Sequence, residues 1–154
     1  GGAHVADVGG ADNGRVPCVD LATAPRLMKA LHDAIGAGLV RACHDISEGG
    51  LGVALAEMAI AGRFGAELDL RAVPNEQAGD AATLLFSESP TRFVAEVRPE
   101  HAAAFEAALE GCVAARIGSV LLDERLIVTG LDGSPVIQVP VADLQAAWQA
   151  TTVV

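Results

Sequence analysis

The sequence of 154 residues is poor in aromatic side chains and in positive charge, and each shortage argues against a class of function. It holds four Phe, one Trp and no Tyr, which is too few for the aromatic platforms on which single-stranded nucleic acids stack. Ten basic residues stand against twenty acidic ones, and the formal net charge of −10 disfavours binding to a nucleic-acid backbone. We therefore expect no nucleic-acid partner.

Cysteines and long apolar runs are also scarce. The three cysteines, Cys18, Cys43 and Cys112, are odd in number and far apart, so they indicate neither a disulfide framework nor a thiolate zinc site. No apolar run approaches the roughly 20 residues of a membrane span, and the N-terminus lacks the features of a signal peptide. These absences predict a cytoplasmic protein with no membrane partner.

What the sequence does have is the composition of a folded domain, with 51% hydrophobic and 19% charged residues. Residues 1–20 are rich in glycine and turn formers, which predicts an entry arm or linker from a preceding domain. One domain is then expected over residues 21–154. Because the sequence starts with Gly1 rather than Met, we expect it to belong to a longer polypeptide.

The spacing of apolar and turn-forming residues predicts helices alternating with strands. Helices are expected over residues 24–36 (with Thr23 as N-cap), 49–61, 99–110 and 141–150. Strands are expected over residues 39–43, 65–70, 92–97, 113–121, 125–129 and 135–139, with a hairpin turn at Asp132-Gly133 and a further strand-like run at 84–86. This order argues for an α+β or α/β fold, of which we favour α+β, with a single-layered, mixed β-sheet covered by helices.

The densest polar segment is His44-Asp45-Ile46-Ser47-Glu48-Gly49-Gly50, between an expected strand and an expected helix. Ser47 can cap that helix, the glycines let a ligand approach the backbone, and the first N–H groups of the helix favour phosphate or carboxylate. Asp45 offers a hard oxygen ligand for Mg²⁺. The alternative is structural: Ser47 and Glu48 cap the helix and complement its dipole, while the glycines serve close packing.

A second polar segment, Ser87-Glu88-Ser89-Pro90, lies between two apolar runs. A ligand-facing turn has this composition, and so does an ordinary capped loop. The sequence contains no phosphate-binding P-loop pattern, no G-x-S-x-G elbow and no H-E-x-x-H pattern. His44 and Asp45 are neighbours on a strand and should point to opposite faces, so no acid–base dyad is expected.

The segment H-D-I-S-E-G-G-L at 44–51, continued by A-L-A-E-M-A-I-A-G at 54–62, resembles phosphoribosylformylglycinamidine synthase. More narrowly, the chain is similar to the second C-terminal AIRS-type domain of the synthetase subunit in the multi-subunit form of that enzyme. G-A-E-L-D-L at 65–70, L-F-S-E-S at 85–89 and G-R-V-P at 14–17 support the resemblance, which covers nearly the whole chain.

The resemblance implies a ligase of purine biosynthesis. Such an enzyme uses ATP and Mg²⁺ to activate the formamide oxygen of formylglycinamide ribonucleotide, and glutamine-derived ammonia then gives the amidine. The implied partners are a preceding ATP-binding domain of the same polypeptide, a glutaminase subunit and a small accessory subunit. The catalytic His and the main ATP ligands of the family belong to other domains, so no catalytic residue is assigned here and the isolated chain is expected to be inactive.

The resemblance also assigns roles to residues of the two polar segments. Asp45 stands at the position of a magnesium ligand. The expected nucleotide- and phosphate-binding residues are Ser47, Glu48, Gly49, Gly50, Ser87, Glu88 and Ser89, in an auxiliary site without turnover. Pro90 stands where the family usually has Gln, which removes one amide from the turn.

Two other hypotheses remain open from the sequence. The chain could be a structural packing module without a ligand, or a domain of another ATP-dependent enzyme of the same superfamily, such as a hydrogenase-maturation or selenophosphate enzyme. A nucleotide site requires an exposed Asp45 carboxylate, whereas a structural module allows Asp45 to be buried as a cap or ion-pair partner.

Overall fold

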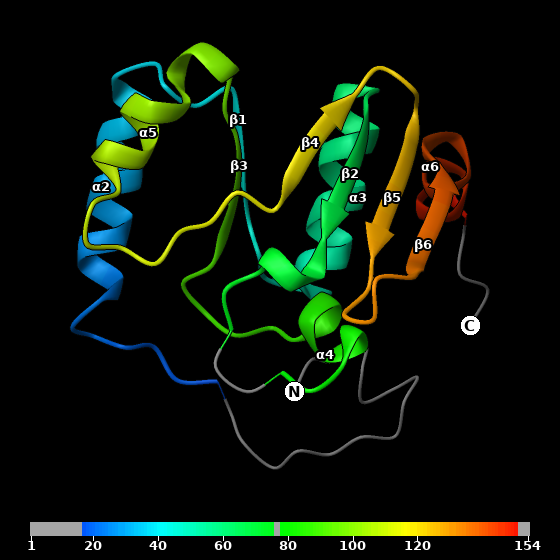
Figure 1. Ribbon diagram of the computed structural model, residues 1–154, viewed down its shortest axis with the longest axis horizontal. Coiled ribbons are helices and arrows are strands. Elements are labelled where there is room, and N and C mark those ends of the chain that lie inside the picture. The colour runs from blue at the N-terminus through cyan, green and yellow to red at the C-terminus, as the bar shows by residue number, and fades with distance from the viewer. Residues whose placement is uncertain (1–16, 76–77, 151–154) are drawn as a thin grey trace. The chain divides into compact units, whose positions relative to one another are not determined.

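A computed structural model describes residues 17–75 and 78–150 of the chain (Figure 1). Most of the expected linker, residues 1–16, therefore lies outside the described residues. The chain divides into two compact units, of which unit 1 comprises Gly1–Ala54 and Leu85–Ala115, and unit 2 comprises Leu55–Leu84 and Arg116–Val154. The division passes through helix α3 (Gly50–Gly62) and helix α4 (Ala81–Phe86).

The described part of unit 1 holds two complete α-helices and a two-stranded antiparallel ribbon, besides the start of α3 and the end of α4. Helix α2 (Ala24–Gly36) lies beside α5 (Ala102–Ala108), which follows the 3₁₀ turn η2 (Pro99–His101) (Figure 1). The predicted bounds of α2 are confirmed, and its buried residues recur at helical spacing, namely Ala24, Leu31 and Ala34. Strands β1 (Ala42–Asp45) and β3 (Phe93–Glu96) form the ribbon.

The start of α2 and the start of β1 differ in detail from the predictions. Thr23 is the N-cap residue, but its hydroxyl donates to the Asp20 carboxylate at 2.8 Å and makes no cap hydrogen bond. The predicted strand from residue 39 begins later, because the Leu39 N–H group donates to the Ala34 carbonyl and closes the end of α2.

Unit 2 is built on a four-stranded mixed sheet. Its strands are β2 (Gly65–Asp69), β4 (Gly118–Leu121), β5 (Arg125–Thr129) and β6 (Pro135–Pro140), in the order β4-β2-β5-β6. Strands β2 and β5 are parallel and the other pairs are antiparallel. Helix α6 (Val141–Gln149) follows β6 directly. The mixed α and β architecture is confirmed, but the described strands form two sheets rather than the expected single layer.

The core of unit 2 follows the alternation of its strands. Leu126 and Val128 of β5 are fully buried while their neighbours are partly exposed, as expected for a strand with one covered face. The predicted hairpin is also confirmed, since β5 and β6 pair around a turn in which Gly133 has a φ of +84°.

Two predicted strands are wrong in part. Residues 84–86 end the short helix α4, because the Asp80 carboxylate accepts hydrogen bonds from the Thr83 N–H group and hydroxyl at 2.8 Å each and starts a helical turn. Of residues 113–121, only Gly118–Leu121 pair with β2, and Val113 is exposed. None of the helices in the described ranges is long and apolar enough to cross a membrane.

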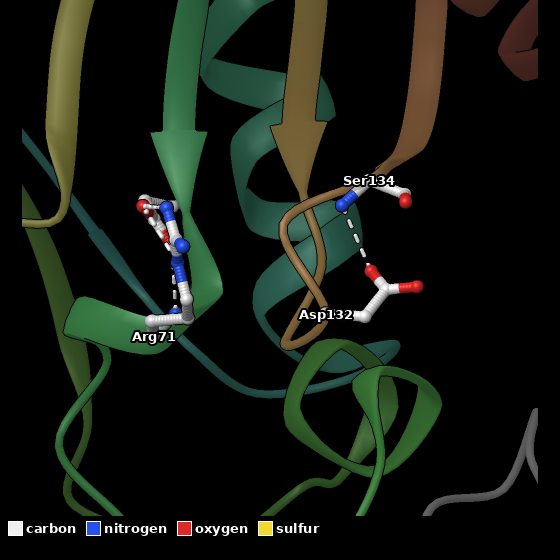
Figure 2. A network of polar contacts seen from close by, with 4 residues as sticks. Arg71, Asp132 and Ser134 are labelled. Atoms are coloured by element: carbon white, nitrogen blue, oxygen red, sulfur yellow. Dashed lines mark hydrogen bonds and ion pairs between the residues drawn. The ribbon is translucent and has the colours of Figure 1, made fainter.

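The turn after β2 is held by an ion pair. Arg71, in the 3₁₀ turn η1 (Leu70–Ala72), donates to the carboxylate of Asp69 through Nε and Nη2, the latter at 2.6 Å, and its N–H group donates to the same carboxylate (Figure 2). In the neighbouring hairpin, too, an aspartate carboxylate accepts a hydrogen bond from the main-chain N–H group two residues later: that of Asp132 accepts from Ser134 at 2.8 Å (Figure 2). The hydrogen bonds from Arg71 lower the pKa of Asp69 to about 2.

This lowered pKa predicts an acid-dependent contribution to stability. Folding favours the charged form of Asp69, so its contribution is fully present above the unfolded pKa of 3.8 and is lost as the pH falls through about 2. The melting temperature of the native chain should therefore exceed that of Asp69→Asn at neutral pH, and the difference should shrink as the pH is lowered from about 4 to about 2. A difference independent of pH in thermal melts would contradict this assignment.

Candidate functional site

The structure brings the two polar segments of the sequence together in unit 1. The N–H group of Gly49 donates to Oε1 of Glu88 at 2.9 Å, across a separation of 39 residues. A second hydrogen bond joins the same two segments, from the Ile46 N–H group to the Arg92 carbonyl at 2.9 Å. Residues 45–50 and 87–92 thus form one surface at the end of the β1–β3 ribbon where Asp45 pairs with Phe93.

Gly50 allows the close approach of these segments. Its φ is +70°, in the region that residues with a Cβ rarely adopt. A Cβ at this position would lie 2.6 Å from the Leu85 carbonyl oxygen and 2.8 Å from that of Ser87. Both neighbours are backbone atoms, so neither can move aside cheaply. The packing interpretation of this glycine is therefore supported.

The Glu88 carboxylate occupies the start of helix α3. The N-terminal N–H groups of a helix attract negative charge, and here one of the chain's own carboxylates binds the N–H group of Gly49, immediately before the first residue of α3. The next N–H group, that of Gly50, donates to the Ser47 carbonyl at 3.1 Å. A bound anion would therefore meet Glu88 at the place where the sequence suggested free N–H groups.

Asp45 is exposed at the edge of this surface. The hydrogen bond from the Ser47 hydroxyl, followed by one from the Asp45 backbone, lowers the pKa of the Asp45 carboxyl, so it is ionised at neutral pH. Nδ1 of His44 lies 2.7 Å from the Asp45 main-chain oxygen and 3.6 Å from its carboxylate, too far for a hydrogen bond to the latter. Neighbours on a strand were expected to point to opposite faces, but these two side chains come within ion-pair distance of each other.

The carboxylate of Asp45 fits one kind of metal site. No group of three or more His, Cys, Asp or Glu side chains able to hold a metal occurs within residues 17–75 and 78–150. Mg²⁺ in nucleotide sites is commonly held by one or two carboxylates together with phosphate oxygens and water. An exposed, ionised Asp45 suits that arrangement, in which the nucleotide supplies the remaining oxygens.

Arg92 is a structural residue of the site that the sequence analysis did not single out. Its guanidinium group donates to the Ser87 carbonyl through Nη2 and to the Ser89 carbonyl through Nε, the latter at 3.1 Å. Burial lowers the pKa of Arg92, which is the expected effect of desolvating a cation. Arg92 therefore fixes the turn from which Glu88 reaches Gly49.

Thr91 adopts a strained conformation between Pro90 and Arg92. Its φ is +62°, which is unusual for a residue branched at Cβ. Its hydroxyl oxygen is buried and has no hydrogen-bond partner among the described residues. Both features are costly, and strain of this kind concentrates at binding and switch regions. Nothing in the sequence around Thr91 indicated the positive φ or the unpartnered hydroxyl.

Comparison with known proteins identifies the family. Residues 2–130 match the family described as "AIR synthase related protein, C-terminal domain". The chain belongs to this family. It is 32% identical over 151 residues to "Phosphoribosylformylglycinamidine synthase subunit PurL" of Alkaliphilus metalliredigens, a match that covers 97% of this chain and 20% of that protein. The chain thus spans about a fifth of the length of this curated relative.

Solved structures share the fold of this family member. PurL of Thermotoga maritima complexed with FGAR superimposes with a TM-score of 0.74 at 24% identity, covering 88% of this chain and 23% of that one. PurL from this organism has also been solved complexed with ATP, and there is a structure of PurLQS. HypE of E. coli, a hydrogenase maturation protein, is more distant, with a TM-score of 0.59 at 26% identity over 74% of this chain and 38% of that one.

The packing of Gly50 predicts a sharp contrast between two glycine substitutions. Gly50→Ala forces a Cβ against backbone oxygens at a positive φ and should lower the free energy of unfolding by more than about 2 kcal/mol. Gly36→Ala is the matched control, because a Cβ at the end of α2 meets nothing within 4 Å. Denaturant melts of the two variants test this, and equal stabilities would contradict it.

The strain at Thr91 predicts that a smaller residue stabilises the chain. Thr91→Gly removes both the unfavourable Cβ and the unpartnered hydroxyl and should raise the free energy of unfolding by about 1 kcal/mol, after the entropic cost of glycine. Thr91→Ala removes the hydroxyl and the γ-methyl group but keeps the Cβ, and its stability should fall between the two. Melting temperatures should therefore rise in the order Thr, Ala, Gly, and a loss of stability in Thr91→Gly would show that the conformation is not strained.

Proposed function

We propose that this chain is the second C-terminal AIRS-type domain of the synthetase subunit of a phosphoribosylformylglycinamidine synthase. The whole enzyme is an ATP-dependent ligase that converts formylglycinamide ribonucleotide to the amidine with glutamine-derived ammonia. The observation that carries the proposal is the joining of the 45–50 loop to the Ser87-Glu88-Ser89 turn, in a chain of this family. Both segments are those on which the sequence resembles that enzyme.

The proposed partners follow from the fraction of the related PurL subunit's length that this chain matches. A domain equal to about a fifth of the related PurL subunit must function with the rest of such a polypeptide. We assign to it a preceding ATP-binding domain in the same chain, and a glutaminase subunit and a small accessory subunit in a cytoplasmic complex. Large apolar side chains exposed on unit 1, such as Leu21, Met28 and Val113, are consistent with surfaces covered in such an assembly.

Within this domain the joined segments form an auxiliary site for the phosphates of a nucleotide. Asp45 would hold Mg²⁺, which neutralises and orients phosphate oxygens when bound. Ser47, Glu48 and Ser89 are exposed and can meet the ligand, whereas Gly49 and Gly50 are buried and shape the loop. Ser87 and Glu88 are half-buried and keep the two segments together. The domain contributes binding and no catalytic group, so by itself it has no ligase activity.

One observation favours a second candidate, a packing module without a ligand. The Glu88 carboxylate already occupies the helix N-terminus that a phosphate would use. The exposed carboxylate of Asp45 favours the nucleotide site instead, because a structural cap has no need of an ionised group facing water.

Thermal melts of the 154-residue chain with ADP or ATP, with and without Mg²⁺, separate these candidates. A ligand that binds the native state at a hundredfold excess over its Kd stabilises by about 2.7 kcal/mol, or roughly 5 to 10 °C for a chain of this size. We expect a saturable rise in Tm that requires Mg²⁺ and disappears in Asp45→Asn. Glu106→Gln, which removes an exposed carboxylate from α5 of the same unit, is the matched control and should keep the rise.

Absence of any rise, or an equal rise in Asp45→Asn, would overturn the auxiliary site and leave the packing module as the function of this domain.

A further inference from the structure

Unit 1 contains a hollow at the end of the β1–β3 ribbon away from Asp45. Its volume is about 300 Å³, and it is lined by Gly38, Leu39, Val40, Arg41, Arg98 and His101. Residues 38–41 precede β1, and Arg98 and His101 follow β3. The lining therefore includes two arginines, a histidine and no acidic residue, in a chain whose formal net charge is −10.

The backbone holds Arg41, Arg98 and His101 beside the hollow. The Arg41 N–H group donates to the Glu96 carbonyl at 2.8 Å, which fixes Arg41 beside the end of β3. The His101 N–H group donates to the Arg98 carbonyl at 2.9 Å and closes the 3₁₀ turn η2. Arg98 is the N-cap residue of this turn and His101 is its last residue, and both line the hollow.

The other wall of the hollow is the closed end of helix α2. The N–H groups of Ala37, Gly38 and Leu39 all donate to carbonyl groups of the last turn, at 2.9 to 3.1 Å. Gly38 turns the chain with a φ of +73°. The accepting carbonyl groups belong to residues 33–35, which do not line the hollow, and the polar side chains of its lining are those of Arg41, Arg98 and His101.

The neighbouring carboxylates orient the arginines without filling the hollow. Nε of Arg41 lies 3.3 Å from Oε1 of Glu96, and Nη1 of Arg98 lies 3.9 Å from Oε1 of Glu100. Neither glutamate lines the hollow. Both arginine side chains remain about half exposed, at 49% and 56%. Glu96 is only 25% exposed, but Glu100 is 61% exposed, and an ion pair as open to water as Arg98–Glu100 is weak. A multivalent oxyanion can therefore compete for the guanidinium groups.

We propose that this hollow binds a small phosphomonoester. Guanidinium forks match the geometry of phosphate oxygens, and an imidazole adds a further donor. The volume lies at the lower end of small-molecule sites and exceeds what a phosphate group fills, and the aliphatic residues Leu39 and Val40 give the carbon part of the ligand an apolar neighbour.

The proposed site is independent of the auxiliary nucleotide site. A four-residue strand spans about 13 Å, and the two sites lie at opposite ends of β1. A ligand as small as glycerol 3-phosphate does not reach both.

Two-dimensional amide NMR of the full 154-residue chain, titrated with glycerol 3-phosphate and separately with inorganic phosphate, tests the proposal. We expect saturable shifts confined to the amides around residues 38–41 and 98–101, with glycerol 3-phosphate bound more tightly than inorganic phosphate. Arg98→Gln and Arg41→Gln should each weaken binding at least tenfold. Arg116→Gln, which removes a guanidinium group from unit 2, and Asp45→Asn should leave the affinity unchanged.

Equal affinities for glycerol 3-phosphate and inorganic phosphate at these amides would overturn the assignment of a phosphomonoester ligand and would identify a site for free phosphate. No saturable shift at these amides, or the same weakening in Arg116→Gln, would overturn the site altogether. The same spectra show whether each variant is folded. Because Asp45→Asn removes the proposed Mg²⁺ ligand of the nucleotide site only, unchanged binding in this variant keeps the two proposals distinguishable.

Discussion

The hydrogen bond from the Gly49 N–H group to the Glu88 carboxylate is the contact on which the candidate site depends. It joins a loop at the start of helix α3 to a turn that precedes β3, and it places a negative charge where the helix favours one. Gly50 makes the joint possible because its missing Cβ leaves room for the backbone of Leu85 and Ser87. Arg92 completes it by holding the carbonyl groups of Ser87 and Ser89.

This arrangement separates the structural role of Glu88 from the binding role that we propose for Asp45. Glu88 satisfies the helix start without a ligand, so the loop is held in place before anything binds. Asp45 and the hydroxyl of Ser47 lie outside that contact, with the carboxylate ionised and facing water. The chemistry of a bound nucleotide would therefore fall to the exposed rim of the loop, while the buried glycines keep its shape.

The β1–β3 ribbon gives unit 1 two different ends. Its register pairs Asp45 with Phe93 at one end and Ala42 with Glu96 at the other. The first end carries the loop with the acidic Asp45, and the second carries two arginines and a histidine around a hollow. Because the ribbon has only two strands, the residues that flank each strand meet at both ends, and short polar segments there become neighbours.

The sequence by itself determined the elements whose signals are local. Helix α2, the hairpin at Asp132-Gly133 and the loop before α3 follow from periodicity, turn chemistry and glycine spacing within a few residues, and the motif 44–51 was enough to suggest the family. Tertiary structure alone decided what depends on residues far apart. No short sequence pattern encodes these contacts. They include the pairing of strands into two sheets, the hydrogen bond between Gly49 and Glu88, and the hydrogen bonds from Arg92 to the 87–89 turn. The helix ending at Phe86 also escaped prediction, because an apolar run of three residues has no measurable period and only the hydrogen bonds from Thr83 to Asp80 distinguish a helix from a strand.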